Sequence, residues 1–164
     1  MAKKMINLTI DGEKVSVADG TTLLEASQMQ QVNIPTLCYH KDLCIAGNFR
    51  VCVVEVEVWR VLPAACSTPV MEGMVVYTNS PKVRRARKDV LALLVSEHST
   101  QCTTCYRSMN CELQELSAEY NIDNEIYINL LKDKNFTIDK SSWAIEKDEA
   151  KCIRCQRCVR TCAE

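Results

Sequence analysis

Eleven cysteines in a chain of 164 residues constrain this protein more than any other feature of its sequence. They fall into three groups, and most stand at spacings typical of metal ligands. The N-terminal stretch contains no continuous apolar segment of the secretory type, so we expect a cytosolic chain whose thiols stay reduced. An odd number of cysteines would also leave one unpaired in a complete disulfide scheme. The sequence therefore predicts several sites for soft metals.

Charge and hydropathy argue against two classes of partner. The net charge of −1, from 20 basic and 21 acidic residues, predicts no nucleic-acid binding. No stretch approaches the ~18 apolar residues of a transmembrane helix, so we expect no membrane span and a cytoplasmic location. The basic run from Lys82 to Lys88 is interspersed with apolar residues at helical spacing. We interpret it as the solvated face of an amphipathic helix, or alternatively as a docking surface for an acidic partner or electron carrier.

The N-terminal half of the chain has the pattern of a mixed α/β domain. Asp11–Gly12 between two alternating segments predicts a hairpin turn, and Thr22 with Glu25 forms a capping box for a helix running to about Val32. Extended runs are expected at Ile6–Ile10, Val15–Val17, Val51–Val58, Val61–Cys66 and Met74–Thr78. This order predicts a β-grasp domain of the ferredoxin type over residues 1–79.

The remaining residues predict two smaller parts. We expect a helix over residues 82–97, a second one over 111–120, and a polar connection over 121–150 with one short strand. The predicted organisation is α+β. A β-grasp domain is followed by a small helical domain, residues 80–140, and by a partial ferredoxin motif, residues 141–164.

The last group of cysteines has the spacing of a bacterial ferredoxin, whose cysteines hold a 4Fe–4S cluster. Its members are Cys152, Cys155, Cys158 and Cys162. Ala163 stands where the motif usually has proline, and the fourth cysteine of this run ordinarily binds the other cluster of a two-cluster fold. No second run follows, so the site is predicted to be incomplete. Either Cys162 bends back, a partner subunit completes the site, the chain is a fragment, or the tail stays without metal.

The middle group combines one histidine with three cysteines: His98, Cys102, Cys105 and Cys111. By spacing alone these residues fit tetrahedral zinc as well as a 4Fe–4S cluster. The ferredoxin run later in the chain favours the 4Fe–4S cluster. We expect these four residues to be the firmest ligands of the protein.

The first group is Cys38, Cys44, Cys52 and Cys66, and the segment CYHKDLCIAGNFRVCVVEV, residues 38–56, resembles a known 2Fe–2S loop. The similarity is to the N-terminal iron–sulfur region of NAD(P)-linked and electron-bifurcating FeFe-hydrogenases, which the large iron–sulfur subunit of respiratory complex I shares. Residues 98–112 resemble the 4Fe–4S module of this family, and residues 152–162 resemble the first half of its two-cluster module. The likeness extends over nearly the whole chain in the family's order.

The resemblance implies 2Fe–2S ligands at positions 38, 49, 52 and 66, but position 49 is phenylalanine, which cannot bind iron. Three outcomes follow from this substitution. The cluster is absent, Cys44 replaces the missing ligand after the loop is remodelled, or the fourth ligand is not a protein group. The predicted cofactors are therefore one or two 4Fe–4S clusters, with a 2Fe–2S cluster that depends on position 49.

The resemblance also implies a function. We expect an electron-relay subunit that has no catalytic site of its own. It would belong to a cytosolic NAD(P)H-linked hydrogenase or formate dehydrogenase complex of an anaerobe. Such a complex could also be of the electron-bifurcating type. The implied partners are a subunit that binds flavin and NAD(P), a hydrogenase or formate dehydrogenase subunit, and ferredoxin. The chain has no glycine-rich dinucleotide fingerprint of its own. Two alternatives remain, which are a structural adaptor that has lost clusters and a zinc-stapled interaction module.

Overall fold

The computed structural model describes residues 4–99, 101–122 and 136–163. They form two compact units. The first contains the chain up to Arg87 together with the segment from Gln156 onward, and the second extends from Lys88 to Cys155. The predicted boundaries at residues 80 and 140 stay a prediction. The return of the C-terminal segment to the first unit was not expected from the sequence.

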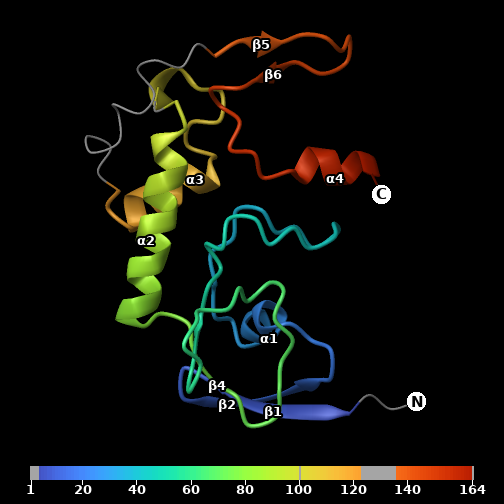
Figure 1. The fold of residues 1–164 in the computed structure, drawn as a ribbon, viewed down its shortest axis with the longest axis vertical. Coiled ribbons are helices and arrows are strands. Elements are labelled where there is room, and N and C mark those ends of the chain that lie inside the picture. Colours follow the sequence, from blue (N-terminus) through green and yellow to red (C-terminus); the bar gives the residue numbers. More distant parts are fainter. Residues whose placement is uncertain (1–3, 100, 123–135, 164) are drawn as a thin grey trace. The chain divides into compact units, whose positions relative to one another are not determined.

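A four-stranded mixed sheet is the base of the first unit, and its strand order is β2-β1-β4-β3 (Figure 1). Strands β1 (Met5–Ile10) and β2 (Glu13–Ala18) form the predicted hairpin. At its turn Asp11 and Gly12 have φ angles of 49° and 91°, a left-handed pair that favours these residue types. Strand β4 (Val75–Tyr77) runs parallel to β1, as a β-grasp connection requires.

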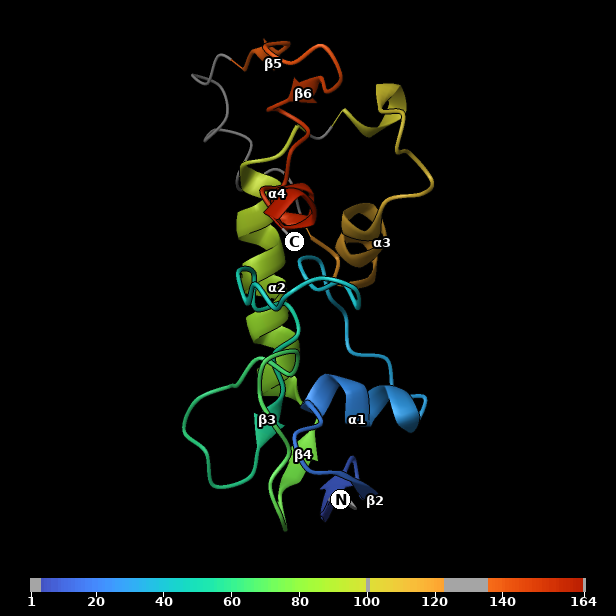
Figure 2. The same ribbon diagram turned by 90° about the vertical axis from the view of Figure 1, so that its right-hand side faces the viewer.

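Helix α1 (Leu23–Met29) begins at the predicted capping box and lies against one face of this sheet (Figures 1 and 2). The Thr22 hydroxyl accepts from the Glu25 N–H, and the Glu25 carboxylate accepts from the Thr22 N–H. The helix ends three residues before the expected Val32. Gln31 adopts a φ of 60°, and the Val32 N–H turns back to the Ser27 carbonyl, which closes the last turn.

The extended runs expected at 51–58 and 61–66 are largely wrong. In this part of the chain the structure has only strand β3 (Glu55–Val56), paired with β4, and an isolated bridge between Val53 and Ala64. Arg50 and Val58 have positive φ angles of 59° and 71°, which bend the chain out of the pleat. The β-branched residues here fill the core rather than extending a sheet.

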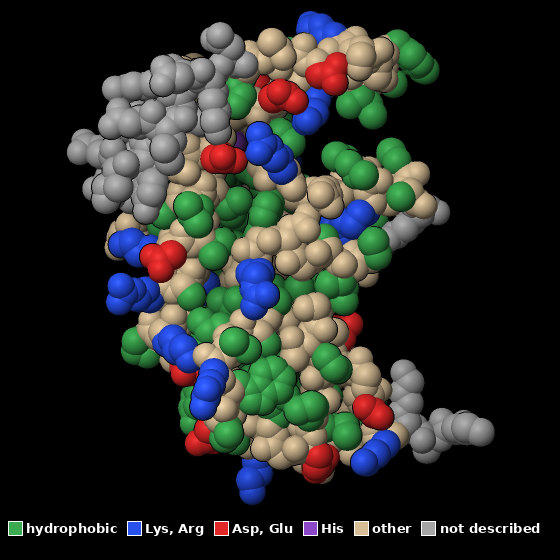
Figure 3. Space-filling model, viewed as in Figure 1, with side chains coloured by type: hydrophobic (Ala, Val, Ile, Leu, Met, Phe, Trp, Pro, Cys, Tyr) green, Lys and Arg blue, Asp and Glu red, His purple; other side chains and the backbone are tan. Residues whose placement is uncertain are grey.

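Helix α2 (Pro81–Ser96) closely matches the predicted helix at 82–97. Pro81 stands at its first position, and the Ser80 hydroxyl accepts from the Val83 N–H at 3.3 Å. Lys and Arg side chains gather on the flank that α2 forms (Figure 3), as the solvated-face interpretation predicts. Arg87 is the exception and corrects that interpretation. Only 2% of it is exposed, because its guanidinium turns inward and donates to the Val53 carbonyl at 2.8 Å.

The second unit is built from short elements after the C-terminal half of α2. A 3₁₀ turn, η1 (Cys102–Thr104), precedes helix α3 (Glu112–Glu119), which matches the expected helix at 111–120. Two paired strands, β5 (Ile138–Asp139) and β6 (Lys147–Asp148), stand where one strand was expected. Residues 123–135 of the predicted connection lie outside the described residues.

A final helix, α4 (Arg157–Ala163), packs within the first unit. Two of its arginines donate to backbone carbonyls of the loop that contains the first cysteines. Arg157 bonds to the Tyr39 carbonyl at 3.0 Å, and Arg160 bonds to the carbonyls of Cys38 and Cys44. Among the described residues no helix has the length and apolar character that crossing a membrane requires.

Candidate metal centres

The first candidate centre lies in the core of the first unit, where Cys52 and Cys66 meet. Their sulfur atoms are 3.4 Å apart, although the residues are 14 positions apart in the chain. Two backbone hydrogen bonds bring them together, from the Val54 N–H to Pro63 and from the Ala65 N–H to Cys52, both 3.0 Å long. The bend that replaces the expected strands therefore creates this thiol pair.

The two thiols differ in acidity because one stabilises the charge of the other. The hydrogen bond from Cys66 lowers the pKa of Cys52 to about 6 against the effect of burial. The pKa of Cys66 is raised, first by that hydrogen bond, then by burial and by the negative charges of Cys52 and Cys38. The Cys66 hydrogen bond thus favours the thiolate of Cys52, which is the form that binds metals.

The other members of the first group lie in different environments. Cys38 is buried, like Cys52 and Cys66, whereas Cys44 is exposed. Phe49 is half-buried at the position where the resemblance implies a ligand. The three implied cysteines therefore share a buried environment, and Cys44 would have to move from the surface to join them.

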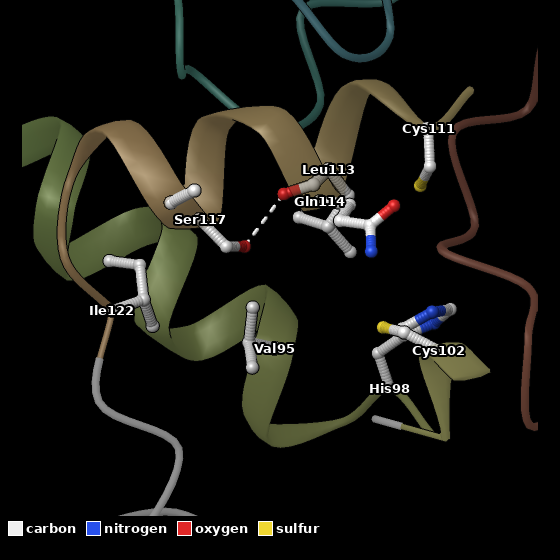
Figure 4. Close-up of a pocket in the computed structure, with 9 residues that line it drawn as sticks. Val95, His98, Cys102, Cys111, Leu113, Gln114, Ser117 and Ile122 are labelled. Carbon is white, nitrogen blue, oxygen red and sulfur yellow. Dashed lines mark hydrogen bonds between the residues drawn. The ribbon is translucent and has the colours of Figure 1, made fainter. Parts of the chain in front are cut away.

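The second candidate centre is a pocket in the second unit with a volume of about 240 Å³, far more than the ~30 Å³ of one water molecule. Figure 4 shows the predicted ligands His98, Cys102 and Cys111 at one end of it. Its other walls come from the C-terminal end of α2 and from α3. The remaining lining residues are Val95, Leu113, Gln114, Ser117, Ala118 and Ile122.

His98 has the environment of a neutral ligand. Burial lowers the pKa of its imidazole, while the charge of Asp148 opposes this shift, so the environment favours the neutral ring. Its Nδ1 atom is buried and has no hydrogen-bond partner among the described residues. A buried imidazole nitrogen without a hydrogen-bond partner is unfavourable in a protein interior. Binding of one ring nitrogen to iron would satisfy that nitrogen.

Cys111 and Cys105, the two cysteines of this group besides Cys102, differ in their position relative to the pocket. Cys111 is the N-cap residue of α3 and lines the pocket. Cys105 follows η1, with its N–H bonded to the Cys102 carbonyl at 3.1 Å, and is not among the residues that line the pocket. Within the described ranges no three His, Cys, Asp or Glu side chains converge to hold one metal ion. Three of four donors around one pocket nevertheless fit a group of several metal atoms.

Sequence reasoning did not find Gln114, which lies in the same pocket. It stands three residues after Cys111, so α3 places both on one face. The available signal was this i, i+3 spacing behind a cysteine ligand. A glutamine at such a position has no chemical signature of its own.

The last cysteine group is divided between the two units. Cys152 and Cys155 belong to the second unit and are half-buried, while Cys158 and Cys162 are exposed on α4 in the first. The predicted ligation by these four cysteines stays a prediction.

Comparisons with known proteins agree with this chemistry. Residues 3–81 match the family described as the 2Fe-2S iron-sulfur cluster binding domain. Residues 87–125 match the NADH-ubiquinone oxidoreductase-G iron-sulfur binding region. The two matches come in the order of the two candidate centres. The chain is thus similar to two iron–sulfur families, one over residues 3–81 and the other over residues 87–125. A 2Fe–2S domain and a 4Fe–4S region are thus confirmed, while the individual ligands stay predictions.

Several known proteins are similar to nearly the whole chain. Subunit HndD of the NADP-reducing hydrogenase of Solidesulfovibrio fructosivorans is 43% identical over 163 residues, which cover 96% of this chain and 28% of HndD. The mitochondrial 78 kDa subunit of NADH-ubiquinone oxidoreductase from Neurospora crassa is 41% identical over 94% of this chain and 21% of that subunit. The predicted relationship to hydrogenases and to complex I is confirmed.

A solved structure is also similar. The crystal structure of the NAD⁺-reducing [NiFe]-hydrogenase in the H2-reduced state matches with a TM-score of 0.81 and 30% identity, over 94% of this chain and 64% of that one. The chain spans between about a fifth and just over a quarter of the length of the two curated relatives above. Activities of those complete proteins therefore enter only as proposals for this chain.

Proposed function

We propose that this chain relays electrons through iron–sulfur clusters within an NAD(P)H-linked hydrogenase or dehydrogenase complex. The observation that carries the proposal is the pocket that joins His98, Cys102 and Cys111 in the family's 4Fe–4S region. A bound cluster supplies one-electron redox chemistry at this place.

The residues of the chain have defined parts in this function. His98, Cys102, Cys105 and Cys111 hold the 4Fe–4S cluster, with the imidazole contributing no negative charge. Cys38, Cys52 and Cys66 are the protein ligands available for a 2Fe–2S cluster. Cys44 is the candidate for a fourth ligand if its loop is remodelled, and otherwise the cluster is absent or takes a fourth ligand that is not a protein group. The apolar side chains in the pocket wall, among them Val95 and Ile122, exclude water and so influence the reduction potential of the cluster.

The partners follow from the relatives. A subunit that binds NAD(P) and flavin and a subunit that turns over hydrogen are the proposed neighbours in the complex, in the cytoplasm, with ferredoxin as a further electron partner. A formate dehydrogenase subunit and electron bifurcation remain alternatives within this proposal.

A second function, that of a structural adaptor, is favoured by one specific observation. Phe49 occupies a ligand position of the 2Fe–2S loop, and the rest of that domain nevertheless has its sheet, its helix and its buried core. An intact domain that lacks one cluster ligand is what we expect of a subunit that kept its fold and its docking surfaces after losing clusters.

The test is the metal content of the chain purified under anaerobic conditions. Iron and acid-labile sulfide are measured per chain, together with the visible and EPR spectra. At least four irons and four sulfides, with a reducible 4Fe–4S signal, support the relay. A chain without iron or sulfide identifies an adaptor, and zinc without sulfide identifies a zinc-stapled module. Either result rejects the relay.

A further inference from the structure

Gln114 occupies a special position in the pocket of the second unit. Figure 4 shows its side-chain amide in the space between Cys111 and His98, on the side of the pocket where the predicted ligands lie. It reaches there from the first turn of α3, directly after the N-cap residue Cys111.

The orientation of this amide is determined by its oxygen. Gln114 Oε1 accepts a hydrogen bond from the Met109 backbone N–H at 2.9 Å. Met109 lies at a left-handed turn with a φ of 64°, and its N–H is directed at Gln114 in α3. Because only the oxygen of an amide accepts, the NH₂ group is the part that faces the pocket.

This NH₂ group is a free donor in an otherwise apolar wall. Among the described residues, the Gln114 side chain forms one hydrogen bond, in which Oε1 accepts from the Met109 N–H. Its amide nitrogen donates no hydrogen bond to these residues. The other hydroxyl or amide side chain in the wall, Ser117, already donates to the Leu113 carbonyl at 2.6 Å. The remaining wall residues are aliphatic, so Gln114 is the donor that the wall offers to a bound group.

We propose that the Gln114 amide donates a hydrogen bond to sulfur of the cluster bound in this pocket, and thereby raises its reduction potential. The inference rests on the proposed 4Fe–4S function of the site. Reduction adds one electron, and hence one negative charge, to the cluster. An N–H dipole directed at sulfur stabilises the more negative state, so the equilibrium shifts toward the reduced cluster.

Two variants separate this role from a structural one. Gln114→Leu removes both the donor and the acceptor. Gln114→Glu keeps an oxygen that accepts from Met109 and preserves the turn, but replaces the donor with a negatively charged acceptor. Gln28→Leu is the matched control, because it makes the same substitution on the exposed surface of α1 in the first unit.

The readout is the midpoint potential of the 4Fe–4S cluster in an EPR-monitored redox titration of the anaerobically purified chain. We expect both Gln114 variants to shift the one-electron equilibrium about tenfold toward the oxidised cluster, a lowering of ~59 mV. Gln28→Leu keeps the potential of the original chain. A Gln114 variant with a full complement of iron and sulfide and an unchanged potential overturns the proposal.

A spectroscopic measurement decides the question even if neither variant assembles a cluster. The original chain is labelled with ¹⁵N at its glutamine side-chain amides, and the reduced cluster is examined by pulsed EPR. Gln114 is the single glutamine that lines the pocket, so a ¹⁵N coupling supports the hydrogen bond and its absence overturns it. A chain without any iron would instead reject the proposed function, so the two failures are distinguishable.

Discussion

At the scale of single residues, position 49 is the predicted 2Fe–2S ligand position that has no thiolate. Cys38, Cys52 and Cys66 are buried, and the acidity of Cys52 suits it to metal binding. Phenylalanine at position 49 leaves the set one thiolate short of the four that a 2Fe–2S cluster takes. The surrounding domain keeps the core that would support such a cluster.

We therefore predict that Phe49→Cys adds a 2Fe–2S cluster. The variant should contain about two more irons and two more sulfides per chain than the original, because four thiolates then surround the site. Iron and sulfide analysis with the visible spectrum measures this gain. Phe49→Ser is the control, since it opens the same space without adding a thiolate. Equal iron in the two variants would show that position 49 does not limit the cluster.

The imidazole of His98 is the second residue whose chemistry can be tested alone. We predict that His98→Cys keeps a 4Fe–4S cluster and lowers its midpoint potential, because a thiolate adds the negative charge that the neutral ring lacks. EPR-monitored titration measures the shift. His40→Cys, at an exposed histidine in the first unit, is the control. An unchanged EPR signal and potential in His98→Cys would show that His98 is not a ligand.

Arginines hold the elements of the first unit against its cysteine loops. Arg87 ties α2 to the residue after Cys52, and Arg160 ties α4 to the carbonyls of Cys38 and Cys44. Arg160 is only 7% exposed. Its guanidinium donates the hydrogen bonds that connect α4 to those two carbonyls. The helix that contains Cys158 and Cys162 is thus linked to the loop of the first candidate centre.

We predict that Arg160→Gln lowers the free energy of unfolding of the first unit by about 1–3 kcal/mol, because it leaves backbone carbonyls without a charged donor. Urea unfolding followed by circular dichroism measures the loss, and cleavage by trypsin after Lys41 should become faster. Arg154→Gln is the matched control, since Arg154 pairs with Glu97 at 3.3 Å on the surface and such pairs contribute little. Equal losses in the two variants would argue against the link between α4 and the loop.

The two units of the whole molecule differ in what stabilises them. The first has a continuous apolar core contributed by the sheet, α1 and the loops behind them. In the described part of the second unit, the buried apolar side chains are few: Leu91, Ala92, Val95, Leu113 and Tyr120. We therefore expect the second unit to depend on bound metal for its stability more than the first unit does.

Removal of iron should therefore affect the units unequally. We predict that chelation under anaerobic conditions greatly accelerates amide hydrogen exchange in α3 and around His98, while β1, β2 and α1 keep their protection. Hydrogen-exchange mass spectrometry of the loaded and stripped chain measures this. Uniform loss of protection in both units would contradict the prediction, as would no change in α3.

Much of the local structure could be predicted because its causes lie within a few residues. The hairpin turn follows from Asp11 and Gly12, and the start of α1 follows from Thr22 and Glu25. The bent course of residues 51–66 could not be predicted, because β-branched residues favour burial as much as they favour a strand. The bend depends on backbone partners nine and thirteen positions apart, in the bonds from Val54 to Pro63 and from Ala65 to Cys52.

The sequence by itself determined the kind of chemistry in this protein, since the residue types and spacings of cysteines and histidine specify soft-metal ligands before any fold is known. Only the tertiary structure decided which of these groups meet. The contact between Cys52 and Cys66, the inward turn of Arg87 and the amide of Gln114 in the pocket depend on packing between distant segments. Spacing along a chain reports local geometry, whereas long-range contacts form only when the elements bury their apolar faces together.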